Sequence, residues 1–570
     1  MLPSDIFLRP SKKSIELLNP VLICLGMLTI AVVFFLYGKY GFNLTDEGLW
    51  LAQAKRIIAG EIPHKDFVHV KFTGSGLLHT LYLWKFTDHW VLVSRGVGLF
   101  QLFSANLLWV LMLQHYLFQK PDILRVWLGS TMAFMLSLHD FPIMAWNTID
   151  GIVFATAGIF CFSRKKNILG VILVGCSILF KQSFLPFLIF ILTTIWAGKD
   201  KSFLHKLLLS GWGLAPCTLY LLWILVSGGG SDFLQQVVFG SSKLSQSEIW
   251  TGLFYRPGLW FCIGAAVAGI FLWIWIKNKG NWKTRASPLL FLLLTGVCTW
   301  AALHPEKVHR VMISSSLFLF GFTLIALLAL RKSDRSLGWA GGACLALAYS
   351  VNVSVGYNNM LLMLGPLVFV FYAALLRLMK QRTPPETVQP YLFMQNVSFV
   401  ALLFGFFIAF HFLRSNVIYR DLPSARLTES LSGTLPGAAG VFTSPSNAEM
   451  IKDILGLMRK YPDRAVAVLP AFAGIWPGLA AQNPIANDWV QSTEVPSDKA
   501  WDQVFVSLNK LRKSGGVALL SKYYVEDISF ERRALCLSRE ATNGGYSRIL
   551  NYFEDFSPSY ESDYFKVYVF

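Results

Sequence analysis

Six ionisable residues lie close together in the stretch from Leu44 to Trp84, directly after the first apolar segment. They are Asp46, Glu47, His64, Asp66, His69 and Lys71. A carboxylate such as that of Asp46 can remove a proton from a hydroxyl group, and an ammonium such as that of Lys71 can hold an anionic phosphate. The spacing of His64, Asp66 and His69 could ligate a divalent metal, although such groups in loops more often bond to the backbone. The stretch therefore predicts a chemical site.

An amphipathic helix is expected to position the acidic pair. Asp46 and Glu47 begin a segment whose apolar residues, from Leu49 to Ile58, fall on one face, with Lys55 and Arg56 opposite. This pattern is typical of a helix lying on a membrane surface. The pair also suits a helix cap, because acidic side chains in the first turn interact favourably with the helix dipole.

The composition indicates a polytopic α-helical membrane protein. The 570 residues are 54% hydrophobic and 15% charged. Many apolar runs approach the roughly 20 residues that cross a hydrocarbon core of about 30 Å. About thirteen transmembrane helices are predicted, at 19–40, 91–117, 122–139, 144–162, 168–180, 183–198, 204–226, 257–277, 286–303, 309–330, 337–352, 359–379 and 394–414.

The distribution of positive charge predicts the orientation. A net charge of +17 could indicate nucleic-acid binding, but the basic residues lie in short clusters between the spans. Anionic lipid headgroups and the positive-inside rule explain such clusters, so we expect no nucleic-acid partner. With the N-terminus in the cytoplasm, alternation puts the basic loops inside. The Asp46 loop and the tail then lie on the extracytoplasmic side.

Two domains are expected. Residues 1–414 form the membrane domain, whose first external loop covers 41–90, and 415–570 form a soluble extracytoplasmic domain. The tail has strand-length apolar runs at 465–470, 516–520 and 564–570, alternating with helical patterns at 447–460 and 498–513. This alternation predicts a small α/β domain. Since it carries no obvious catalytic constellation, a docking or lid role is favoured.

The first loop resembles that of the GT-C membrane glycosyltransferases, of the protein O-mannosyltransferase and aminoarabinose-transferase type. The matching features are the Asp46-Glu47 pair, the helix from Ala54 to Gly60, the segment from Pro63 to Phe67, and the turn from Lys71 to Gly74. Within that turn, Phe72-Thr73 stand where the family commonly has a proline pair. The resemblance implies a GT-C fold and a polyprenyl-phosphate-linked sugar as donor.

Sugar transfer from a lipid phosphate needs a base and cations for the leaving phosphate. Asp46 is the predicted base, and Glu47 either orients it or continues the cap. Phosphate partners are expected at predicted outer boundaries; the candidates are Lys71, Arg95 and Lys181. Lys71 and Lys181 could instead snorkel from helix ends, and Arg95 could pair with Asp88 or a headgroup. Residues predicted to bind substrate are Asp66, His139, Asp140 and Tyr357. His139 and Asp140 could instead form the C-terminal turn of a helix before Pro142. Asp150, inside the fourth span, is the most membrane-embedded acid.

The leading hypothesis is an inverting glycosyltransferase in a membrane that we expect to be the bacterial inner membrane. The acceptor is a hydroxyl of a lipid, a glycan or a protein, and a divalent metal is a conceivable cofactor. A transporter or flippase of lipid-linked sugars is the main alternative. It should show inverted repeats or polar groups spread through the membrane, and the sequence shows neither. A non-catalytic scaffold leaves the crowded first loop unexplained.

Overall fold

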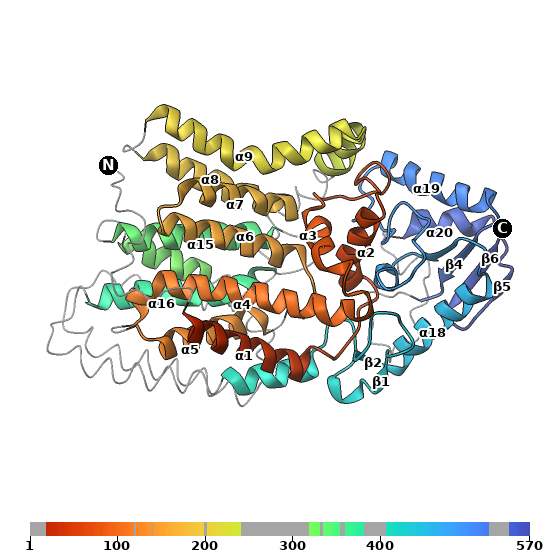
Figure 1. Cartoon of the computed structure of the whole chain (residues 1–570), viewed down its shortest axis with the longest axis horizontal. Helices are drawn as coiled ribbons and strands as arrows, with labels where there is room; N and C mark the ends of the chain where they lie inside the picture. The colour runs from red at the N-terminus through yellow and green to blue at the C-terminus, as the bar shows by residue number, and fades with distance from the viewer. Residues whose placement is uncertain are drawn as a thin grey trace, which may run out of the picture.

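The structure is a computed structural model that describes residues 19–118, 121–139, 141–198, 202–240, 319–330, 334–353, 359–380, 406–523 and 546–570. It is mostly helical, with a small sheet near the C-terminus. Figure 1 shows a helical bundle and a tail domain, with α2 (Asp46–Ile58) and α3 (Gly74–Leu83) between them. Asp140, Tyr357 and the predicted spans at 257–277 and 286–303 lie outside the described residues.

The helices of the bundle follow the predicted apolar segments. They are α1 (Pro20–Tyr37), α4 (Trp90–Leu117), α5 (Ile123–Leu138), α6 (Asn147–Ser163), α7 (Asn167–Phe180), α8 (Leu185–Ala197), α9 (Phe203–Val226), Leu319–Leu330, α15 (Arg335–Asn352), α16 (Leu364–Lys380) and 406–416. Shorter helical pieces accompany them: η1 (Thr87–His89), η2 (Gln182–Phe184), α10 (Gly230–Phe233), the π-helix η3 (Leu234–Phe239) and η4 (Asn359–Met363). The predicted segments are thus confirmed as helices wherever they are described.

Among the described residues, four helical segments are long and apolar enough to cross a membrane: α1, α4, α9 and Met360–Leu378. Large apolar side chains are exposed on three of them, since Phe35 of α1 is 74%, Phe100 of α4 is 52% and Val226 of α9 is 88% accessible. Such exposure is unfavourable in water, but it carries no such cost against lipid tails. The total of thirteen spans and their orientation stay predictions.

The tail forms an α/β domain as predicted. It contains η6 (Ser424–Arg426), β1 (Glu429–Ser430), β2 (Phe442–Thr443), α18 (Pro445–Lys460), β3 (Val466–Leu469), η7 (Ala473–Ile475), α19 (Asp498–Lys513), β4 (Val517–Ser521), α20 (Ser547–Glu554), β5 (Tyr560–Glu561) and β6 (Phe565–Val569). The main sheet has the order β3-β4-β6-β5, in which β3 and β4 are parallel and the other neighbours antiparallel. The three strands and two helices predicted for the tail are confirmed within a few residues.

The tail packs directly on the first loop. Phe42, Leu51 and Trp90 of the loop region are buried in one hydrophobic cluster with residues of α18 and of the sheet. Backbone hydrogen bonds join the two parts, from Gly41 N to Phe442 O (2.8 Å) and from Val68 N to Ala486 O (2.6 Å). The first loop and the tail therefore share a core.

Helix α2 does not lie on the membrane with one face open, as its pattern predicted. Residues 47–54 are all buried, and so is Arg56. One side of α2 packs on α3, where Gly76 approaches Ala54, and the tail covers another side. The predicted helix forms, but its basic residues bind groups of the tail, so the face opposite the apolar one is covered by protein rather than open to solvent.

The closest approach between α2 and the tail needs two glycines. A Cβ atom added to Gly48 would lie 2.1 Å from the Cα of Gly474. The backbone there is fixed by a hydrogen bond from Gly474 N to Leu44 O of 2.8 Å. Since backbone atoms cannot rotate away from a clash, any side chain at position 48 must push the tail from α2.

We predict that Gly48→Ala lowers the thermal unfolding midpoint of the full chain and speeds proteolysis near the tail junction. Overpacking costs about 1–3 kcal/mol, which exceeds the gain of about 1 kcal/mol that alanine brings to a helix interior. Gly211→Ala in α9 is the matched control, because nothing lies within 4 Å of a Cβ added there. Equal midpoints for Gly48→Ala and the control would contradict the packing described.

Candidate functional site

Asp46 stands at the first turn of α2 and is held by residues of the tail junction. Oδ1 of Asn43 accepts the backbone N–H groups of Thr45 (2.8 Å) and Asp46 (2.9 Å), so the chain enters α2 through an Asx-type turn. The Tyr419 hydroxyl donates to Oδ2 of Asp46 at 2.8 Å, and Nη1 of Arg420 lies 2.9 Å from the same oxygen. These contacts fix the direction of the carboxylate.

Glu47 forms a buried two-point ion pair with Arg95. Nε and Nη2 of Arg95 donate to the two carboxylate oxygens of Glu47 at 2.6 and 2.9 Å. Arg95 also donates to the carbonyl oxygens of Gly38 (2.6 Å) and Gly41 (2.5 Å). The Arg95 charge is thus balanced by Glu47, and the pair joins the end of α1 to the starts of α2 and α4. Asp88 is not among the partners of Arg95 in this geometry.

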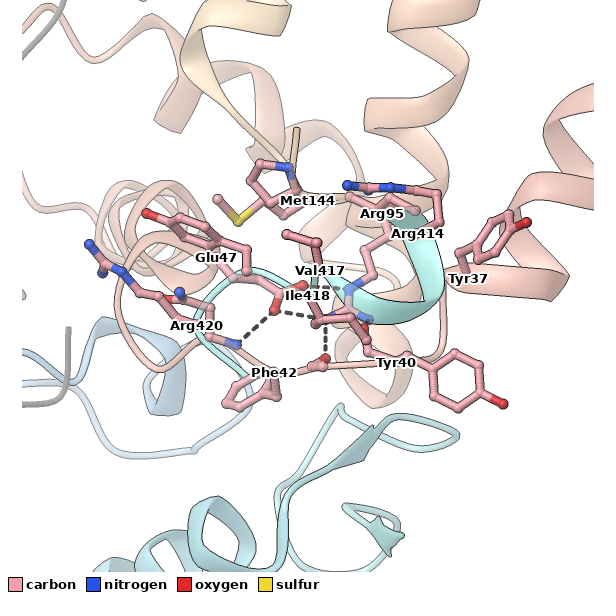
Figure 2. A pocket seen from close by; sticks show the side chains of 15 residues that line it. Tyr37, Tyr40, Phe42, Glu47, Arg95, Met144, Arg414, Val417, Ile418 and Arg420 are labelled. Atoms are coloured by element: carbon pink, nitrogen blue, oxygen red, sulfur yellow. Dashed lines mark hydrogen bonds and ion pairs between the residues drawn. The ribbon is translucent and has the colours of Figure 1, made fainter. Parts of the chain in front are cut away.

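A pocket of about 280 Å³ opens beside these groups (Figure 2). Its charged lining residues are Glu47, Arg95, Arg414 and Arg420, so cations outnumber acids there. Apolar walls come from α1, from the loop after α5 and from 414–418; they include Tyr37, Ile143, Met144, Val417 and Ile418. The pocket therefore offers an amphiphilic ligand positive charge beside an apolar surface.

Three of the residues at this pocket were not predicted: Arg414, Tyr419 and Arg420. Arg414 is buried and donates to Phe141 O at 2.8 Å. The Arg420 backbone has φ +52°, a left-handed conformation that is rare for residues other than glycine. The sequence signal was a Tyr-Arg-Asp run shortly after the last apolar segment, where the chain turns into the tail.

Asp421 anchors this turn. Its carboxylate accepts the Phe42 N–H at 3.1 Å and the Thr443 hydroxyl at 2.6 Å, which ties the first loop, the turn and β2 together. Burial raises the pKa of this carboxyl. Asp421 thus holds the backbone from which the Arg420 side chain reaches Asp46.

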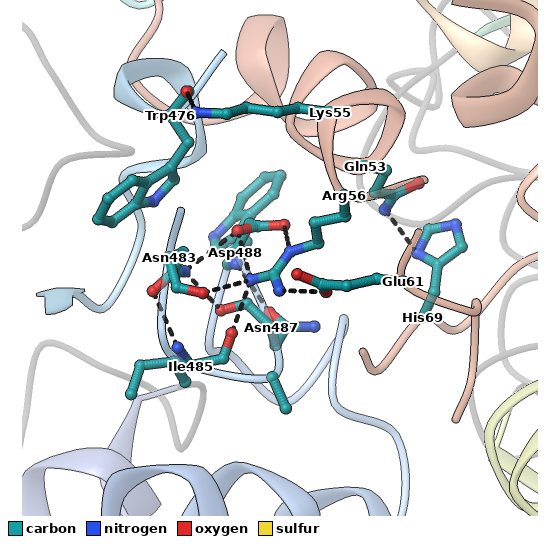
Figure 3. Close-up of polar contacts among 12 residues, drawn as sticks. Gln53, Lys55, Arg56, Glu61, His69, Trp476, Asn483, Ile485, Asn487 and Asp488 are labelled. Carbon is teal, nitrogen blue, oxygen red and sulfur yellow. Dashed lines mark hydrogen bonds and ion pairs between the residues drawn. The ribbon is translucent and has the colours of Figure 1, made fainter. Parts of the chain in front are cut away.

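The basic residues of α2 bind the tail (Figure 3). Nε and Nη2 of Arg56 lie 2.9 and 3.0 Å from the two Asp488 oxygens, and Nη1 lies 2.8 Å from Glu61. Lys55 donates to the carbonyl oxygens of Trp476, Leu479 and Ala481. Burial lowers the pKa of Lys55 to about 8. Both cations dock α2 onto the tail.

The structure does not bring the three predicted phosphate partners together. Of these, Arg95 lines the pocket. The ammonium of Lys71 pairs with Glu494 of the tail at 3.1 Å and lies 5.4 Å from the Trp50 ring centre. The ammonium of Lys181 is buried and lies 3.5 Å from the Thr148 hydroxyl. Neither lysine is among the described residues that line this pocket.

His64, Asp66 and His69 do not converge on one point. Both ring nitrogens of His64 have partners, Gln236 at 3.0 Å and Tyr220 at 2.8 Å, while His69 bonds Gln53 at 2.9 Å. Asp66 is exposed and accepts the Ile62 N–H. Within the described part of the chain, no group of three or more His, Cys, Asp or Glu residues could hold a metal. The ring of His64 instead packs the first loop against α9 and η3, and the ring of His69 packs it against α2.

Two further candidates lie inside the bundle. His139 is buried, and its Nδ1 lies 2.6 Å from Leu136 O, as in the helix-end role that the sequence left open. Asp150 is also fully buried and accepts hydrogen bonds from Ser75 and Gln101, both at 2.7 Å. Asp150 thereby connects α3 and α4 to α6, away from the lining of the pocket.

We predict that the first-loop packing weakens in acid. Burial lowers the pKa of His64 to about 4, so the folded protein favours the neutral ring. This stabilisation is present above the ordinary histidine pKa of about 6.5 and is lost as the pH falls towards 4, by up to about 1.4 kcal/mol per pH unit. The thermal unfolding midpoint of the wild type should therefore drop between pH 7 and pH 5.

The matched variant is His64→Asn, because asparagine tolerates the positive φ of 68° found there. Its midpoint should depend less on pH. Some dependence should persist, since burial also lowers the pKa of His69. An unchanged pH slope in this variant would refute the role given to His64.

The candidate site is therefore the cationic, partly apolar pocket at the junction of α1, α2, α4 and 414–421, with Asp46 held beside it. Comparisons of the chain with protein-family models, with curated proteins and with solved structures find no match.

Proposed function

We propose that this chain is an integral-membrane inverting glycosyltransferase of the GT-C type, which transfers a sugar from a polyprenyl-phosphate carrier to a hydroxyl acceptor. The observation that carries the proposal is the fixed Asp46 carboxylate beside a pocket that combines cations with apolar walls. A lipid-linked phosphate needs that combination. Its anionic head interacts with guanidinium groups, and its hydrocarbon chain lies against apolar side chains.

The position of the pocket suits a lipid ligand. Tyr37 is the last residue of α1 and Arg414 lies near the end of 406–416, while Arg95 is in the second turn of α4. Since α1 and α4 are long and apolar enough to cross a membrane, their shared end is the level at which lipid headgroups would lie. A lipid carrier could then place its phosphate in the pocket while its hydrocarbon chain stays in the bilayer.

In the proposed reaction the acceptor oxygen attacks the anomeric carbon of the donor. Asp46 takes the proton from the acceptor hydroxyl as the new carbon–oxygen bond forms. The bond between the anomeric carbon and the phosphate oxygen breaks, and its electron pair leaves with the phosphate. Arg414 and Arg420 stabilise the charge on that phosphate, and a single displacement inverts the anomeric configuration.

Glu47 and Arg95 act as positioning residues in this proposal. Their buried ion pair lines the pocket and holds the start of α2 against α1 and α4. We place the site on the extracytoplasmic face of a bacterial inner membrane, with the N-terminus in the cytoplasm. The acceptor is then a lipid, glycan or protein hydroxyl on that face.

We predict that Asp46→Asn slows sugar transfer by about 10²–10⁴-fold, the usual contribution of a positioned general base. The test uses the full chain in proteoliposomes with a panel of labelled polyprenyl-phosphate sugars. Glu429→Gln is the control, because this carboxylate lies in the tail with its side chain 42% exposed, 3.7 Å from the more exposed Lys452.

Transfer at the wild-type rate by Asp46→Asn would rule out Asp46 as the base. Movement of labelled lipid across the bilayer without consumption of any donor would instead favour a transporter.

A further inference from the structure

We propose that the phosphate of the lipid carrier and the Asp46 carboxylate compete for Arg420, so that donor binding releases the base. This inference rests on the proposed function and deepens it. Arg420 both lines the pocket and pairs with Asp46 at 2.9 Å. The Arg420 guanidinium therefore contacts both the pocket and the Asp46 carboxylate.

The geometry around Arg420 suits an exchange of partners. Its guanidinium carbon lies 5.0 Å from the Tyr419 ring centre and 5.6 Å from the Trp489 ring centre. Nη1 also donates to the Thr45 hydroxyl. Aromatic rings attract a guanidinium through their faces, so these two ring contacts do not themselves occupy its N–H donors.

The other cations at the pocket are less suited to this exchange. Arg95 is buried, with its charge balanced by two bonds to Glu47 and its remaining donors directed at backbone carbonyls. Arg414 is buried and bound to Phe141 O. By contrast, the Arg420 side chain is 19% exposed and its acid partner 13%. The Arg420–Asp46 pair is therefore more accessible to an incoming phosphate than the Arg95–Glu47 pair, whose side chains are 4% and 2% exposed.

The backbone at the turn should stay in place during the exchange. Asp421 is fixed by Phe42 N and Thr443, and the Phe442 N–H donates to Lys39 O at 2.8 Å. Movement is then confined to the Arg420 side chain. Once Arg420 has turned to the phosphate, Asp46 keeps the Tyr419 hydroxyl and can accept the acceptor's proton. The donor must therefore bind before the acceptor can be activated.

A binding experiment tests the competition without any turnover. The full chain in detergent is titrated with sugar-free polyprenyl phosphate, using wild type, Asp46→Asn, Arg420→Gln and the double variant. Removing the competing carboxylate should tighten binding by roughly three- to tenfold in Asp46→Asn. In the Arg420→Gln background the same change should alter binding by less than about twofold.

Controls separate the competition from other effects. Arg420→Lys retains a cation and should retain part of the tightening, and thermal unfolding shows whether each variant is folded. Inorganic phosphate is titrated in parallel and should bind far more weakly than the lipid; equal affinity would overturn the lipid as the source of the phosphate.

The outcomes also separate this inference from the proposed function. If wild type binds polyprenyl phosphate and Asp46→Asn binds it no more tightly, the competition is wrong while the transferase proposal stands. The competition is also wrong if Asp46→Asn tightens binding as much in the Arg420→Gln background as in the wild type. If the folded wild type binds no polyprenyl phosphate, both proposals fail.

Discussion

The contact between helix α2 and the tail domain is the constraint on which the rest of the structure depends. It combines a close approach of two glycines with a buried, two-point ion pair between Arg56 and Asp488. Both charges are almost fully buried, and removing one partner of such a pair costs about 3–5 kcal/mol because the other charge loses its compensation. The tail is therefore part of the site's framework.

This contact matters for chemistry because α2 carries Asp46 at its first turn. One end of α2 is fixed by the Glu47–Arg95 pair against the bundle, and its second half is held by Lys55 and Arg56 against the tail. The turn at 419–421 contacts Asp46 itself, through the Tyr419 hydroxyl and the Arg420 guanidinium. Because α2 is held at both ends, the Asp46 carboxylate has a defined direction relative to the pocket. The proposed proton transfer depends on that direction.

Much of the fold could be predicted from the sequence, because it depends on local patterns. Apolar runs located the described bundle helices, and alternating short patterns located β3, β4, β6, α18 and α19. Asp46 and Glu47 were correctly placed in the first turn of α2. These features depend on residues that are neighbours in the chain, where helix and strand periodicity is visible.

The partners of the charged groups could not be predicted, because they are distant in the chain. Arg56 and Asp488 are 432 residues apart, and Tyr419 is 373 residues from Asp46. With no local partner, Lys55 and Arg56 were assigned to an open helix face. Arg95 was assigned to a phosphate, although Glu47 neutralises it. The strongest site signal that was overlooked is the turn from Arg414 to Asp421.

The proposed function requires an anion site between Arg414 and Arg420, next to Asp46. The most direct measurement is a cryo-electron microscopy map of the full chain with bound polyprenyl phosphate. We expect the phosphate oxygens within about 4 Å of both guanidinium groups, the range of an ion pair, and the lipid chain along the pocket's apolar wall. Phosphate density at Lys71 or Lys181, with the pocket between Arg414 and Arg420 empty, would contradict the account.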